Sequence, residues 1–187
     1  MDIVLSEDQA IRPYDLSILA SLLTGLLGLQ ACMQIAAIGS PVVHLFAAVL
    51  FVITCPVLFV WLHRLRWNAE VPGRVHRWAP VWVVGMWFVP ALNLVLPYQF
   101  MVDIARAGVP RARAGEVTRQ VLAWWLSWLV GLTAAALSVN FWFFSFRWVA
   151  LLPTWVGGVF LALASALLIV VVQRLSALHP ADERLTS

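Results

Sequence analysis

A set of polar side chains, most of them between residues 61 and 108, accompanies the apolar segments of a strongly apolar sequence. Gln99, Asp103 and Arg106 have i, i+4, i+7 spacing, which places them on one face of a helix. One hypothesis is a site for an anionic headgroup or solute. The alternative is an interfacial ion-pair network that holds the chain at the membrane surface. This inner polar set consists of Arg64, Asn68, Asn93, Gln99, Asp103, Arg106 and Gln173.

The sequence motifs give little support for metal binding, cofactor binding or catalysis. His44 and His63 are 19 residues apart, about 28 Å along a helix. His63 and His76 share a loop without a Cys or carboxylate set at metal-ligand spacing. The sequence has no nucleophile elbow, P-loop, H-E-x-x-H motif or dinucleotide fingerprint. We therefore predict no metal and no cofactor, and the sequence favours a protein without enzymatic activity over an enzyme.

A second, uncharged polar group falls inside the apolar runs. It consists of Gln30 and Gln34 one turn apart, His44 and Asn140. Polar residues within a membrane segment are functional candidates by default. The alternative is hydrogen bonding between helices.

The composition identifies the environment of these groups. Of the 187 residues, 63% are hydrophobic and only 11% are charged, against about 25% charged in soluble domains. Mean hydropathy is +0.90 and the pI is near 9.5. All twelve basic residues are Arg, and they flank apolar runs. They indicate contact with the bilayer and its anionic headgroups rather than with nucleic acid, in an all-α membrane protein with one domain over residues 1–187.

Four segments are apolar over roughly the 20 residues that a membrane-spanning helix needs. They are residues 16–38, 42–62, 120–141 and 150–173. Stripes of small residues on the first and last span permit close helix contact, either within the chain or between subunits. The stripes contain Ala20, Thr24 and Gly28 on the first span and Gly158, Ala162 and Ala166 on the last.

Residues 79–107 are apolar but contain Pro90 and Pro97, and each proline disfavours a continuous helix. If this segment spanned, with the N-terminus inside, six arginines would lie on each side. If it enters and returns, eleven lie on one side and only Arg147 on the other, which is the positive-inside pattern. We therefore predict four spans and a re-entrant hairpin with Asn93 at its tip and both termini cytoplasmic; the alternative is five spans.

The chain also has eleven tryptophans, of which eight gather toward the predicted inner face. An aromatic belt at headgroup level is the ordinary interpretation, although eight on one side indicates that some pack around the hairpin. An aromatic cage for a cation is the alternative.

WLHRLRWNAE (61–70), APVWVVGMWFVPALNLVLPYQFMVDIARAG (79–108) and WWLSWL (124–129) resemble small bacterial membrane proteins grouped as domain of unknown function 4328. The pattern falls on Trp61, Arg64, Asn68, Pro80, Trp82, Trp87, Phe88, Pro90, Asn93, Leu94, Pro97, Tyr98, Asp103, Trp124 and Trp125. Asp103 stands where family members often have Glu. The resemblance implies a bacterial cytoplasmic membrane and brings no established activity.

Three functions follow as hypotheses. The first is a non-enzymatic accessory or scaffold subunit that packs against a membrane protein partner. The second is a small homo-oligomeric channel or carrier with the hairpin lining its path. The third is a protein that binds lipid headgroups or handles lipids.

The topology can be tested by labelling from the two sides of the membrane. We expect a tag at Ser40 or Phe144 to be labelled from outside, because both follow an odd number of spans. A probe at Gly108 should be labelled from inside. Labelling of Gly108 from outside alone would rule out the hairpin.

Overall fold

The computed structural model describes residues 14–69, 85–87, 89–109, 113–143 and 147–178, and this part of the chain is helical. The helices are α1 (Ser17–Ala36), η2 (Ala37–Gly39), α2 (Pro41–Asn68), α4 (Pro90–Asn93), α5 (Leu96–Gly108), α6 (Ala114–Phe143) and α7 (Arg147–Leu178). Four of them, α1, α2, α6 and α7, are long and apolar enough to cross a membrane. The predicted all-α fold with four spans is confirmed.

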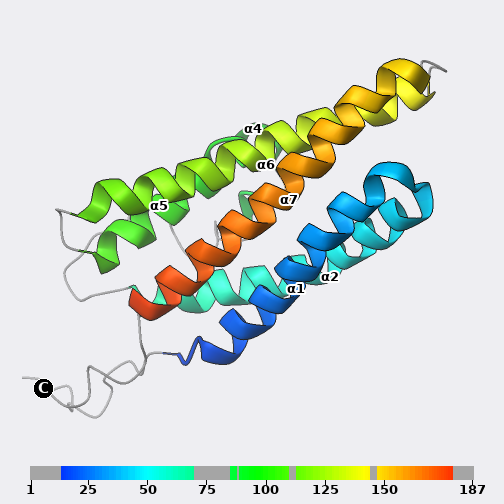
Figure 1. The fold of residues 1–187 in the computed structure, drawn as a ribbon. Coiled ribbons are helices and arrows are strands. Elements are labelled where there is room, and N and C mark those ends of the chain that lie inside the picture. Colours follow the sequence, from blue (N-terminus) through cyan, green and yellow to red (C-terminus); the bar gives the residue numbers. More distant parts are fainter. Residues whose placement is uncertain (1–13, 70–84, 88, 110–112, 144–146, 179–187) are drawn as a thin grey trace, which may run out of the picture.

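The four long helices are arranged in the order α2, α1, α7, α6, and α5 packs against α6 at one end of the bundle (Figure 1). α1 begins, α2 ends, α6 begins and α7 ends at the same end of the bundle. We call it the arginine end, because Arg64, Arg66, Arg106, Arg113, Arg119 and Arg174 belong to the helix segments that meet there. This clustering agrees with the sequence argument for a short segment that returns to its own side.

The spanning helices extend past the predicted apolar limits. α2 continues to Asn68 rather than stopping near residue 62, and α6 begins at Ala114 rather than near residue 120. Hydropathy marks where hydrocarbon ends, whereas a helix continues until its backbone is capped. Ser40 caps α2, since its hydroxyl accepts a hydrogen bond from the Val43 N–H at 3.4 Å, and Pro41 occupies the first turn.

The start of α1 is held by an acidic side chain just outside the helix. The Asp15 carboxylate accepts hydrogen bonds from the Ser17 N–H at 2.8 Å and from the Ser17 hydroxyl at 3.0 Å. These bonds, the backbone bond first, hold the pKa of the Asp15 carboxyl below its usual range. Leu16 occupies the N-cap position of α1, and Asp15, one residue before it, holds the first residue of the helix.

The segment between α2 and α6 is broken, as its prolines predict. α4 ends at Asn93 and α5 begins at Leu96, so no continuous helix runs over residues 79–102. Pro90 opens α4 and Pro97 lies in the first turn of α5. The described residues contain four candidate spans rather than the five of the alternative; residues 79–84 of the predicted hairpin lie outside the described residues.

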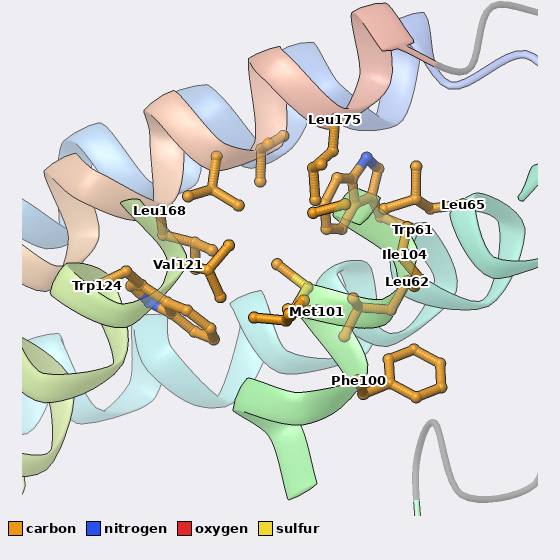
Figure 2. Packing of buried hydrophobic residues seen from close by; sticks show 14 of the residues in the cluster. Trp61, Leu62, Leu65, Phe100, Met101, Ile104, Val121, Trp124, Leu168 and Leu175 are labelled. Carbon is orange, nitrogen blue, oxygen red and sulfur yellow. The ribbon is translucent and has the colours of Figure 1, made fainter. Parts of the chain in front are cut away.

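α5 fills the space between α2 and α6 at the arginine end. Figure 2 shows Met101 and Ile104 of α5 lying between α2 side chains and Val121 of α6. The α2 side chains are Trp61, Leu62 and Leu65, all nearly inaccessible. Because α5 presents apolar side chains to both neighbours, it packs against α2 and α6 at the same time and completes the core.

Glycines set the closest helix contacts. A Cβ on Gly157 would lie 3.1 Å from the Ala135 nitrogen of α6, and one on Gly158 would lie 3.0 Å from the Gln34 carbonyl of α1. The predicted small-residue stripe of α7 thus meets α1 at Gly158, with Ala162 half-buried and Ala166 exposed further along.

The small residues of α1 have a different environment. Gly25 and Gly28 have open space where a Cβ would stand. Ala20 and Thr24 are half-buried. A subunit contact on this stripe therefore stays a prediction.

We expect Gly158→Ala to lower thermal stability in detergent. The added methyl would meet the Ile38 side chain at 2.6 Å and the Gln34 carbonyl at 3.0 Å, and overpacking of this kind costs about 1–3 kcal/mol. Gly25→Ala is the matched control, because its methyl would meet nothing within 4 Å. Equal melting temperatures for the two variants would contradict the close α1–α7 contact.

Candidate functional site

The break between α4 and α5, at Leu94 and Val95, carries backbone groups that no regular helix pairs. The Trp125 indole N–H donates a hydrogen bond to the Leu94 carbonyl at 3.1 Å. The Val95 N–H donates to the Leu92 carbonyl at 3.1 Å, and the Gln99 N–H donates to the Val95 carbonyl at 3.2 Å. A tryptophan of α6 thus supplies the donor that the broken backbone requires at membrane depth.

Aromatic contacts hold Trp125 in position. Its ring stacks on Trp128 with centroids 4.9 Å apart and planes at 20°, and Trp124 lies 5.4 Å away. Trp87, from the first part of the hairpin, meets Trp125 and Trp128 edge-on at 6.2 and 5.9 Å. These four rings form the Trp cluster, as expected for tryptophans that pack around the hairpin rather than only in a belt.

The inner polar set divides into two groups in the structure. In the first, the Asn68 side chain pairs with the backbone of Tyr14: its amide donates to the Tyr14 carbonyl, and its oxygen accepts from the Tyr14 N–H, both at 2.8 Å. The Arg64 guanidinium lies 5.3 Å from the centre of the Tyr14 ring, close enough for a cation–π contact. These two residues hold the chain just before α1 against the end of α2.

The second group lies on the hairpin. Asn93 ends α4, and its side-chain oxygen is buried without a hydrogen bond among the described residues. One Asp103 carboxylate oxygen is in the same state. Gln99 is half-buried and Arg106 is exposed. The part of the chain that the structure describes contains no ion pair between Asp103 and Arg106, so their helical spacing does not bring them into contact.

Two further sets of hydrogen bonds between helices at the arginine end were not predicted from the sequence. Arg174 near the end of α7 donates to Glu116 at 2.8 Å and to Gln120 at 2.7 Å, both near the start of α6. The Trp61 indole donates to the Ser176 hydroxyl at 3.0 Å. The partners are 54 to 115 residues apart, so only their common membrane side was readable from the sequence.

A cavity of about 80 Å3 lies between the α1–α2 pair and the α6–α7 pair, next to the Trp cluster. Its lining is largely apolar and aromatic, with a few polar groups from three helices, α1, α2 and α7: Gln30, Gln34, Thr54, Cys55 and Ser165. Trp87, Trp124 and Trp128 also line it. The described residues contain no cluster of His, Cys, Asp and Glu that could hold a metal ion.

The uncharged polar group predicted inside the apolar runs does not form one site, because its members bond to different partners. Gln30 bonds between helices, since its amide donates to the Ala47 carbonyl of α2 at 3.2 Å. A ring nitrogen of His44 lies 2.8 Å from the Ala37 carbonyl. Asn140 donates back to the Ala136 carbonyl of its own helix at 2.8 Å. Of the four residues in this group, Gln30 and Gln34 line the cavity.

Comparison with known protein families gives a match over most of the chain. The family model described as domain of unknown function (DUF4328) matches residues 24–179, which include α2, the hairpin, α6 and α7. No curated protein matches the chain, and no solved structure matches it.

We expect Trp125→Phe to destabilise the hairpin. The Leu94 carbonyl would lose its donor, and a buried unpaired group costs about 1–3 kcal/mol. Amide exchange over residues 89–100 should accelerate, and the melting temperature should fall by several degrees. Trp128→Phe is the control, because Trp128 stacks in the same cluster without capping the break. Identical exchange in the two variants would contradict the capping role.

Proposed function

The chain belongs to the family described as domain of unknown function (DUF4328), and we propose that it is an accessory or scaffold subunit of the bacterial cytoplasmic membrane. Its four candidate spans make it a multi-pass membrane protein. In our proposal it packs against a transmembrane helix of a different protein, and the break between α4 and α5 is the contact surface. The proposed orientation, with both termini cytoplasmic, is supported by the gathering of arginines at one end.

The observation that carries this proposal is the exposure of two apolar residues, Leu94 and Val95, at the break in the helix. The Leu94 and Val95 side chains are 57% and 48% exposed. They lie level with Trp125, which stands in the apolar part of α6. Irregular backbone at this depth is tolerated where protein buries it or where it lines a wet cavity. Among the described residues, none covers the exposed sides of Leu94 and Val95.

The groups around the break support protein rather than lipid as its cover. The first N–H groups of a helix have no partner within that helix, and α5 begins at Leu96, immediately after the break. Lipid tails offer no hydrogen bonds, whereas a neighbouring helix can supply them as well as apolar contact to Leu94.

A photo-reactive amino acid at Leu94 tests the proposal in native membranes. We expect it to crosslink to one other membrane protein, which also copurifies in fixed stoichiometry in mild detergent. Leu94→Gln should reduce that copurification severalfold, because it places an amide in an apolar contact. Val52, which is 67% exposed on α2, is the matched position for both the crosslinker and the glutamine.

Two outcomes would contradict the accessory role. Equal crosslinking at Leu94 and Val52 would show that the break is no specific contact surface. Crosslinking of Leu94 to a second copy of this chain would replace the accessory subunit by the homo-oligomeric channel or carrier, in which copies of the hairpin face one another.

A further inference from the structure

The cavity beside the Trp cluster lies deep within the bundle. Gln30 comes thirteen residues after the start of α1, and Ser165 comes thirteen residues before the end of α7. Both are therefore about 20 Å from the arginine end along their helices. Thr54 and Trp128 are each fourteen residues from that end on α2 and α6, at about 21 Å. The four long helices thus each contribute to the lining at one depth.

Two polar groups of the lining are left without hydrogen bonds. Gln30 is 4% exposed, and its side-chain amide is oriented by the bond from its NH2 group to the Ala47 carbonyl. That orientation leaves Oε1 as a buried acceptor with no donor among the described residues. The indole N–H of Trp87 is a buried donor with no acceptor among them. Leaving such groups unpaired is costly, so each indicates a missing partner.

The other polar lining groups do not supply those partners. The Thr54 hydroxyl donates to the Leu50 carbonyl and the Ser165 hydroxyl donates to the Leu161 carbonyl, each within its own helix. The lining contains no Asp, Glu, Lys, Arg or His among the described residues, so a charged ligand would be desolvated without compensation. The site therefore suits a neutral ligand that both donates and accepts a hydrogen bond.

We propose that this cavity binds the hydroxyl group of a neutral, apolar alcohol taken from the bilayer. The hydroxyl would donate to Gln30 Oε1 or accept from the Trp87 N–H, and a bound hydroxyl can do both. The cavity of about 80 Å3 exceeds the roughly 10–15 Å3 needed for one water. Apolar neighbours such as Leu27, Leu58 and Leu168 would surround the first carbons of the chain.

One exposed lining residue supports the bilayer as the source of the ligand. Phe51 lines the cavity and is 45% exposed on the surface of α2, about 17 residues from the arginine end of that helix. This distance is about 26 Å, so the exposed part of Phe51 faces hydrocarbon rather than water. Leu94 and Val95 are not among the lining residues, which keeps this site separate from the proposed subunit contact.

Photo-labelling of the purified protein in nanodiscs tests the site. The probe is a diazirine-bearing alkanol, and the comparison is the diazirine-bearing alkane that lacks the hydroxyl. We expect the alkanol to label cavity-lining residues of α2 and to do so at least severalfold more than the alkane. Decanol or dioctanoylglycerol should compete, and the stronger competitor distinguishes a free alcohol from a diacylglycerol-type lipid.

Two pairs of variants distinguish the hydrogen bonds from general packing. Gln30→Met keeps the size of the side chain and should weaken competition about fivefold, as expected for the loss of one hydrogen bond. Gln173→Met, on the exposed side of α7, should leave it unchanged. Trp87→Phe removes the second group, with Trp155→Phe, exposed and outside the lining, as its control.

Three results would overturn the proposal. The first is equal labelling by alkanol and alkane, which would show that the cavity is an apolar recess. The second is no label on the lining from either probe, which would leave water as the occupant. The third is unchanged competition in a folded Gln30→Met protein. Melting curves of each variant establish folding before labelling.

Discussion

A helix that is broken inside a membrane exposes backbone groups which hydrocarbon cannot satisfy, and most features of this chain follow from that constraint. The break between α4 and α5 is tolerated because Trp125 donates to the Leu94 carbonyl. The indole must stand at one depth and one orientation to do this. Stacking on Trp128 and the edge of Trp87 restrict it to that orientation, which gives the tryptophans a structural role beyond the membrane interface.

The same constraint explains why the hairpin was predictable from the sequence. Pro90 and Pro97 each remove a backbone donor, so they mark the interruption directly. The arginine count depends only on which side each loop occupies, and one short returning segment changes it from six and six to eleven and one. Both signals are local or additive along the chain, and neither requires knowledge of which helix faces which.

Contacts that depend on helix orientation were not predictable in this way. Spacing placed Asp103 and Arg106 on one face of α5, yet they form no ion pair among the described residues. The bond between Asn68 and the Tyr14 backbone joins residues 54 apart, and no periodicity encodes it. Gly28 and Gly158 belong to equivalent small-residue stripes, but only Gly158 meets a neighbouring backbone closely. A stripe identifies a face without identifying its partner.

Trp87 connects the two candidate surfaces of the molecule. Its ring packs edge-on against Trp125, which caps the break, and it also lines the cavity with an unpaired indole N–H. Any movement of this ring therefore changes the support of Trp125 and the shape of the cavity together. Gln30 has no such double role, because its contact is with the Ala47 carbonyl of α2, away from the hairpin. In our proposal, a ligand that binds through the Trp87 N–H would therefore also hold the ring that packs against Trp125 at the break.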